Sequence, residues 1–226
     1  MCLSRMGHLI YNTTGDFGKA LGIHCESMRI LRLRSDDRSQ LDAADELQAF
    51  AVVYRRQGML MEAAANLRMA LEIQGRIHGD RHANVGVLAC TLAHVFFDQN
   101  LLEEALEMFK KAMKIYVSTL GKDCWDAGCI CENMGLIKAR QGKHAEALPL
   151  YQKAIGIYNR VHVVDKATEY AAGMNFSAAF SLFRMGDRDG TLSYLRESMR
   201  IYTLLGISNV TSYRTARILA QIEGCR

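Results

Sequence analysis

The chain has 226 residues, of which 50% are hydrophobic and 23% charged, with 18 glycines and one proline. This composition excludes a disordered tail, a collagen-like chain and a coiled-coil rod, and it favours one or two ordinary domains or one array of small repeats. The net charge of +4 is too small for a dedicated nucleic-acid binder, whose binding domain normally carries a strong and clustered positive charge.

Cysteine usage and the N-terminal sequence both favour the interior of the cell. The seven cysteines are too few for a disulfide-rich secreted domain, so we expect free thiols. His8, Asn12 and Asp16 interrupt the N-terminus before the apolar core of a signal peptide can form. The longest apolar stretch, residues 86–97, is shorter than the roughly 20 residues that cross a bilayer. The sequence therefore predicts a cytoplasmic protein without a membrane span.

A short turn segment recurs five times along the chain, at intervals of 43, 42, 42 and 44 residues. Each copy begins with glycine or asparagine and ends with alanine, or with threonine in the last copy. The five segments are 15–20 (GDFGKA), 58–63 (GMLMEA), 100–105 (NLLEEA), 142–147 (GKHAEA) and 186–191 (GDRDGT). Glycine and asparagine tolerate the left-handed backbone that ends many helices, so each segment predicts a turn between two helices.

Small and large apolar residues recur in register with these turns. The small residues seven positions before four of the turns are Ala51, Ala93, Gly135 and Ala179. The residues that follow each turn on one helical face are small (Ser27, Ala70, Ala112, Ala154, Ser198), larger (His24, Leu67, Phe109, Tyr151, Leu195) and finally isoleucine (Ile30, Ile73, Ile115, Ile157, Ile201). Spacings of three, four and seven mark one face of an α-helix. Every unit therefore predicts a helix, a turn and a second helix.

In chain order, these units predict five helix pairs in a single repeat domain over residues 1–226. The pairs cover about residues 1–34, 38–77, 82–119, 123–161 and 165–205, and one capping helix covers about residues 208–224. Asp80, Asp123 and Asp165 follow breaks in the pattern and are expected as N-cap or pre-helix residues. No segment shows the alternation of apolar and polar residues that would predict a β-strand. The predicted fold is therefore an all-α solenoid, in which stacked pairs bury a core between neighbours.

The glycine, alanine and small-residue columns resemble those of tetratricopeptide repeats over nearly the whole chain. The interval of about 42 residues, longer than the usual 34, resembles the kinesin light chain type. Segment 142–155, with Pro149 early in its second helix, is the most similar stretch, whereas Asn100, Arg188 and Thr191 depart from the pattern. The resemblance implies a right-handed α-solenoid of about five repeats. It identifies an architecture rather than a partner.

In tetratricopeptide repeats the first helix of each pair lines a concave surface, so the resemblance implies that its outward side chains form a peptide-binding groove. The candidates, counted back from the turns, are Gln48, Val52, Arg55 and Arg56, then Cys90, Thr91, His94, Phe97 and Asp98, then Glu132, Asn133, Leu136 and Arg140, and finally Phe176, Ser177, Phe180, Phe183 and Arg184. Asn133 stands where such repeats often place an asparagine that holds a ligand's backbone, because an amide both donates and accepts hydrogen bonds.

Charge and aromatic content indicate what such a groove would bind. Four arginines stand against Asp98 and Glu132, and phenylalanines lie between them along the sequence. Arginine makes bidentate contacts to carboxylates, and aromatic side chains are typical interface anchors. The expected ligand is an extended peptide with acidic and apolar or aromatic residues. The alternative interpretation places the phenylalanines in the core and treats the arginines as solvated charges at helix C-termini.

Metal and catalytic sites are not expected. Cys124, Cys129 and Cys131 cluster, and His78 and His82 lie four apart, but neither group has the paired spacing of zinc sites. Cys129 and Cys131 would point about 200° apart on a helix. No phosphate-binding loop, HExxH motif, nucleophile elbow or dinucleotide fingerprint is present. The sequence predicts no cofactor and no enzyme activity.

Two classes of function remain. The first is an adaptor or scaffold for a protein or peptide partner, within a motor or cytoskeletal complex if the kinesin light chain resemblance extends to function. The second is a structural subunit of a larger cytoskeletal or ciliary-type assembly, whose repeats pack permanently against other subunits or against copies of themselves. Helical-repeat RNA binding is disfavoured by the long repeat and by the small positive charge.

Overall fold

The computed structural model describes residues 36–160 and 164–224, together with isolated positions between 18 and 29. Apart from those isolated positions, the predicted first helix pair, residues 1–34, lies outside the described residues. The statements below concern the two described ranges.

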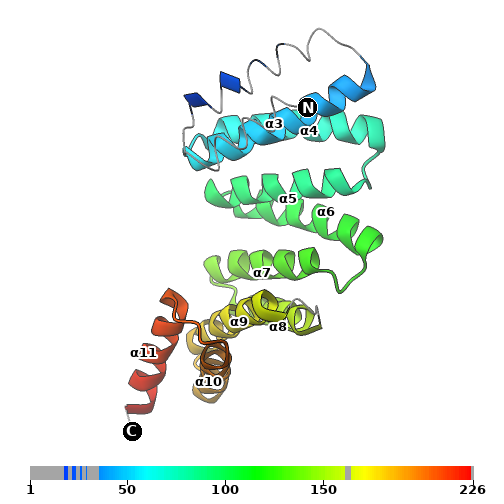
Figure 1. Ribbon diagram of the computed structural model, residues 1–226. Helices are drawn as coiled ribbons and strands as arrows, with labels where there is room; N and C mark the ends of the chain where they lie inside the picture. Colours follow the sequence, from blue (N-terminus) through cyan, green and yellow to red (C-terminus); the bar gives the residue numbers. More distant parts are fainter. Residues whose placement is uncertain are drawn as a thin grey trace. The chain divides into compact units, whose positions relative to one another are not determined.

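Residues 36–160 and 164–224 form nine α-helices and no strand. The helices are α3 (Asp37–Arg56), α4 (Leu60–His78), α5 (Ala83–Asp98), α6 (Leu102–Leu120), α7 (Trp125–Arg140), α8 (His144–Arg160), α9 (Val164–Arg184), α10 (Arg188–Leu205) and α11 (Val210–Gly224). Helices α3 to α10 form four pairs joined by short turns, and α11 follows as a single helix (Figure 1). The prediction of an all-α fold of tandem helix-turn-helix units with a final capping helix is confirmed.

The helices belong to two compact units. The first unit ends at Ile115 and the second begins at Tyr116, so the division falls within α6. Helices α3, α4, α5 and most of α6 form the described part of the first unit, and α7 to α11 lie in the second. A single repeat domain over the whole chain stays a prediction.

The four turns within the helix pairs share one geometry. Gly58, Asn100, Gly142 and Gly186 have φ angles of 78°, 62°, 75° and 83°, the left-handed region predicted for these positions. The next residue of each turn donates its N–H to the carbonyl five positions earlier, as Lys143 does to Lys138 at 2.9 Å. This is the Schellman motif, which satisfies carbonyl groups at the end of the first helix. The same turn chemistry therefore ends the first helix of each pair.

Close contact between small and large residues joins the two helices of each pair. In the α7–α8 pair, a Cβ atom at Gly135 would lie 2.6 Å from Cε1 of Tyr151, so only glycine leaves room for this ring. The corresponding large residues Leu67, Phe109 and Leu195 are likewise buried. Burial of such a side chain contributes about 1.5–3 kcal/mol. The apolar periodicity thus places the core of each unit between its helices.

The aspartates that the sequence places at helix starts are not the N-caps observed for α5 and α7. Asp80 and Asp123 precede α5 and α7, but the N-caps of those helices are His82 and Cys124. The His82 ring accepts a hydrogen bond from a backbone N–H of α5, as a capping side chain does. Asp165 lies inside the first turn of α9 rather than before it. Asp80 and Asp123 are therefore pre-helix residues, one of the two roles expected of them, and not N-caps.

Helix α11 packs on the last pair. Ser212 and Thr215 are buried, whereas Ile218 and Ile222 are half-buried. Its C-terminal end is held by arginines of α10: Nη2 of Arg188 donates to the Ile222 carbonyl at 2.7 Å, and Arg196 forms a 2.7 Å ion pair with Glu223. These contacts fix α11 beside α10.

Candidate functional site

All eighteen residues of the predicted groove, with Cys90 on α5 and Ser177 on α9 among them, lie on first helices, and none of them is buried in the fold. Helix α3 carries Gln48, Val52, Arg55 and Arg56, and α5 carries Thr91, His94, Phe97 and Asp98. Helix α7 carries Glu132, Asn133, Leu136 and Arg140, and α9 carries Phe176, Phe180, Phe183 and Arg184. The first two sets belong to the first unit and the last two to the second. That they act together as one groove stays a prediction.

In the first unit, one predicted ligand-binding arginine has an internal partner. Arg55 of α3 and Asp98 of α5 form an ion pair of 2.5 Å between Nε and Oδ2, with both side chains about one third exposed. The carboxylate that Arg55 was expected to seek in a ligand is therefore supplied by the neighbouring repeat. Thr91 donates to the Val87 carbonyl of its own helix at 2.9 Å. The first unit thus offers less unmatched positive charge than the sequence indicates.

His94 lies over the core of the first unit. Its Nδ1 atom is 2.8 Å from the Cys90 carbonyl oxygen, and its ring meets Phe109 edge-on with centroids 5.1 Å apart. Phe109 is fully buried. The His94 imidazole therefore covers Phe109, the large buried residue of the α5–α6 pair, and is itself partly exposed.

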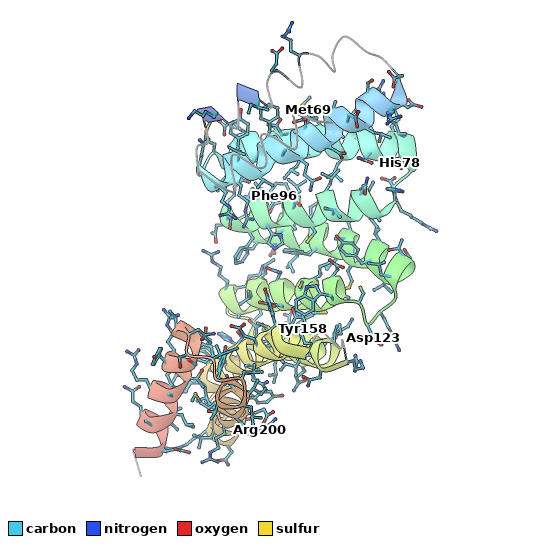
Figure 2. All side chains as sticks on the ribbon, in the orientation of Figure 1. Met69, His78, Phe96, Asp123, Tyr158 and Arg200 are labelled. Carbon is cyan, nitrogen blue, oxygen red and sulfur yellow. The ribbon has the colours of Figure 1, made fainter. Side chains whose placement is uncertain are left out.

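In the second unit, Glu132 takes part in a polar cluster at the surface of α7. Tyr158 of α8 donates its hydroxyl proton to Oε2 of Glu132 at 2.8 Å (Tyr158 is labelled in Figure 2). Desolvation raises the pKa of the Glu132 carboxyl, and the hydrogen bond from Tyr158 partly offsets that rise. Desolvation also raises the pKa of the nearby Cys129 thiol to about 11. A thiol with that pKa is a poor nucleophile at neutral pH, because the thiolate is the reactive form.

Replacing Glu132 by glutamine is expected to reduce the dependence of stability on pH. Because the folded-state pKa of Glu132 is raised, the folded chain binds this proton more tightly than the unfolded chain. The resulting stability is fully present below the ordinary glutamate pKa of about 4.3 and is lost as the pH rises through the folded pKa. The amide oxygen of Glu132→Gln still accepts from Tyr158. Thermal unfolding of both proteins from acidic to neutral pH measures this, and parallel curves would contradict it.

An aromatic cluster adjoins this carboxylate and was missed by the sequence analysis. Trp125 contacts Tyr158 and Tyr170, with centroid distances of 5.0 and 5.1 Å, and Tyr170 is 44% exposed. Trp125 precedes the turn glycine of its pair by 17 residues and Tyr170 precedes its own by 16, so the two are one position out of register. Trp125 also precedes Glu132 by seven residues, which puts both on one face of α7. That spacing was the signal that could have revealed the cluster.

Asn133 uses its amide group within its own helix. Nδ2 donates to the Cys129 carbonyl at 2.7 Å, and Asn175 of α9 makes the same bond to Ala171 at 2.8 Å. Asn175 is buried, whereas Asn133 is half-buried. A role of Asn133 in holding a ligand's backbone stays a prediction.

The phenylalanines of α9 lie at the surface rather than in the core. Phe180 and Phe183 are 48% and 59% exposed, and Phe176 is half-buried. Together with residues of α10 and α11 they line a hollow of about 590 Å³, named here the α9–α11 hollow. Its α11 side is formed by Ile218 and Ile222. From the sequence, α11 was predicted only as a helix that caps the last repeat, and its place beside the candidate groove was not predicted.

Arg184 follows these phenylalanines directly. It is exposed, and it lies four residues after Phe180, so the two share one face of α9. No ion pair of Arg184 is found among the described residues. The second unit therefore presents exposed aromatic surface beside a guanidinium group.

Neither a metal centre nor a membrane span is found in the part of the chain that the structure describes. Within it, no group of three or more His, Cys, Asp or Glu side chains is arranged to hold a metal ion. His78 and His82 stack on each other, with ring centroids 4.3 Å apart. Among the described helices none is both long and apolar enough to cross a bilayer.

Comparison with known families fits the geometry of the helix pairs. Two tetratricopeptide-repeat family models match the chain, one over residues 44–116 and the other over residues 130–165. These helix pairs are tetratricopeptide repeats. The prediction drawn from the turn and small-residue columns is confirmed. No curated protein matches the sequence.

Solved structures share the fold at low sequence identity. BtubC (BKLC) from P. vanneervenii has 17% identity and a TM-score of 0.81, with 92% of this chain and 81% of that chain covered. A putative kinesin light chain from Podosopora anserina with nearly identical TPR-like repeats has 16% identity and a TM-score of 0.74, with 92% and 96% covered. Aspartyl phosphate phosphatase F from Bacillus subtilis has 16% identity and a TM-score of 0.78, with 96% and 54% covered. The solved structures that share this fold therefore include a putative kinesin light chain, the repeat type that the 42-residue interval resembles.

Proposed function

We propose that this tetratricopeptide-repeat protein is a non-enzymatic scaffold or adaptor of the cytoplasm that binds an extended peptide segment of a partner. The segment carries acidic residues together with apolar or aromatic ones. The observation that supports this most is the surface of α9, where Phe180 and Phe183 are about half exposed and Arg184 follows them. Solvent-exposed aromatic rings grouped in this way are typical of interaction surfaces.

The chemistry of this surface favours a carboxylate-bearing partner. Arg184 and Arg140 end the first helices α9 and α7, and both are exposed. A guanidinium group binds a carboxylate with two parallel hydrogen bonds, whereas the adjoining rings bury apolar area at a modest cost in side-chain entropy. Charge would then guide association, and the apolar contacts would supply most of the binding free energy.

A second candidate is a structural subunit of a larger assembly, cytoskeletal or motor-associated if the kinesin light chain resemblance extends to function. Apolar side chains away from the candidate groove support it. Met61 and Leu204 are 72% and 71% exposed, and Met61 lines a shallow hollow with Met59 and Leu101 at the turns of the first unit. A protein that packs permanently through such surfaces would self-associate at increasing concentration. Light scattering across a concentration series distinguishes it from a monomeric peptide binder.

Charge reversal at Arg184 tests the first function. Against a library of fluorescent peptides rich in acidic and aromatic residues, Arg184→Glu is expected to weaken binding at least about tenfold, which corresponds to about 1.4 kcal/mol. Raising the ionic strength from about 0.01 to about 0.15 M, which shortens the Debye length from about 30 to about 8 Å, should weaken binding by the wild type.

The matched control reverses an exposed charge in the loop before α7. Lys122→Glu changes the net charge by the same amount as Arg184→Glu, but it lies outside the first helices. It should leave peptide affinity within about twofold, because a distant surface charge is largely screened. If both variants lost the same amount of peptide affinity, the loss would reflect net charge and not a contact made by Arg184. Absence of saturable binding by the folded wild type would overturn the peptide-binding proposal.

A further inference from the structure

The α9–α11 hollow is an apolar opening beside the phenylalanines of the candidate site. It lies between α9, α10 and the single helix α11, which are coloured from yellow to red in Figure 1. Phe180, Phe183, Leu195 and Ile222 are among its lining residues. Its volume of about 590 Å³ falls within the range of about 300–1,000 Å³ of small-ligand pockets. The hollow therefore has room for at least one bulky side chain of a partner.

The corresponding place one repeat earlier is occupied by the protein's own side chains. There the residue two positions after the turn glycine is His144. Its ring meets the Phe180 ring with centroids 6.1 Å apart, and its Nδ1 atom lies 3.4 Å from Oγ of Ser181. Arg188 is the residue two positions after the next turn glycine, and it reaches instead to the Ile222 carbonyl. An apolar space thus remains at the last repeat boundary where the previous boundary has an aromatic contact.

The surroundings of the hollow are cationic. Arg188 lines it, Arg184 follows Phe183, and Arg217 precedes the lining residue Gln221 by one helical turn. Of the nearby carboxylates, Asp187 accepts from the Gly190 N–H at 2.8 Å and Glu223 pairs with Arg196, whereas Asp189 lines a separate hollow together with Arg196. Positive charge around an apolar opening complements an apolar side chain with carboxylates beside it.

We infer that the α9–α11 hollow receives a bulky apolar side chain, such as phenylalanine or leucine, of an acidic peptide segment. The carboxylates of that segment face Arg184 and Arg217. This inference rests on the proposed peptide-binding function, and it adds the place and the chemistry of the anchor. It also gives α11 a direct part in recognition, because Ile218 and Ile222 form one side of the hollow.

Four short fluorescent peptides test the inference on the full chain. They differ only in a central residue, phenylalanine or serine, and in flanking residues, glutamate or glutamine. Gln221→Trp places an indole at the hollow from an exposed position, and Phe183→Ser removes part of its wall. The control, Leu204→Glu, alters another exposed apolar residue, which lies on α10 outside the hollow.

The wild type is expected to bind the phenylalanine–glutamate peptide at least about tenfold more tightly than the serine–glutamate peptide, a difference of about 1.4 kcal/mol. Gln221→Trp and Phe183→Ser should abolish that difference, whereas Leu204→Glu should preserve it. Arg184→Glu should instead abolish the preference for glutamate over glutamine flanks. Circular dichroism on every variant confirms that the fold is retained.

The outcomes separate the two proposals. Arg184-dependent binding of the glutamate peptides with no preference for phenylalanine would retain the peptide-binding function and overturn the hollow as anchor. A preference for phenylalanine that survives Gln221→Trp and Phe183→Ser would also overturn the hollow. Equal affinity of the wild type for peptides with glutamate and with glutamine flanks would contradict the inference that the bound segment is acidic. Failure of all four peptides to bind the wild type would overturn both the function and the inference.

Discussion

Replacing Phe109 by alanine is expected to lower the free energy of unfolding by about 3–5 kcal/mol, which is the usual cost of truncating a fully buried aromatic side chain. Phe109 lies on α6 with no exposed surface, and its ring packs against His94 of α5. The truncation would leave a cavity between these two helices that a packed core closes only in part. Chemical denaturation followed by circular dichroism measures the loss.

Two further variants control this prediction. Phe109→Leu should cost less than about 1.5 kcal/mol, because leucine conserves most of the apolar volume and occupies the same column as Leu67 and Leu195. Phe183→Ala should change stability by less than about 0.5 kcal/mol, since a substitution at an exposed position rarely matters more. Similar losses for Phe109→Ala and Phe183→Ala would show that Phe109 does not lie in the core.

Replacing Gly135 by alanine is expected to destabilise the second unit by about 1–2 kcal/mol, although alanine is the better helix former. The added Cβ atom would stand 2.6 Å from Cε1 and 2.8 Å from Cδ1 of Tyr151. Tyr151 is 1% exposed, and its ring is held by surrounding residues, so it has no free space into which to move. The two helices α7 and α8 must therefore separate or the ring must leave its preferred rotamer.

Gly156 provides the matched control for this substitution. It lies inside α8, and a Cβ atom there would meet only the side chain of Arg160, at 3.5 Å. Gly156→Ala should therefore raise the free energy of unfolding by about 0.5–1 kcal/mol, the gain in helix propensity. Opposite signs for Gly135→Ala and Gly156→Ala in the same denaturation assay are the expected result. A stabilising Gly135→Ala would contradict the close approach of α7 and α8.

The parts of the fold that local chemistry determines were predictable from the sequence. Asn100 was expected to replace glycine in a left-handed turn, and its φ angle is 62°. The glycine turns end their helices in the same way, because positive φ is a property of single residues and needs no distant contact. The sequence likewise placed Gly135 in a column of small residues on the first helices, since the helical period fixes which residues share a face.

Features that depend on distant residues were not predictable in the same way. Asp123 lies directly before the N-cap of α7, as expected, but the partner of its carboxylate, Arg160 at 2.7 Å, could not be predicted from the sequence. Arg55 was assigned to a ligand, yet Asp98 of the next repeat lies within 2.5 Å of it. Such pairs are decided by how successive repeats stack, and one repeat considered alone does not show its neighbour's charges.

The candidate site was predictable in position but not in detail. The sequence placed Phe176, Phe180 and Phe183 on a first helix, and the structure shows that none of them is buried and that they line one hollow. The contribution of α11 was missed, because Ile218 and Ile222 follow no repeat column of the sequence. Only the packing of α11 on α10 brings them beside α9.

Site-specific photo-cross-linking tests the central claim most directly. A benzophenone analogue of phenylalanine replaces Phe180 on α9 in one sample and Leu204 on α10 in another, both exposed positions. With a peptide selected for binding to the wild type, our account predicts a cross-linked product from position 180 and little or none from position 204. Equal cross-linking from both positions, or cross-linking from position 204 alone, would contradict binding on the outward face of the first helices.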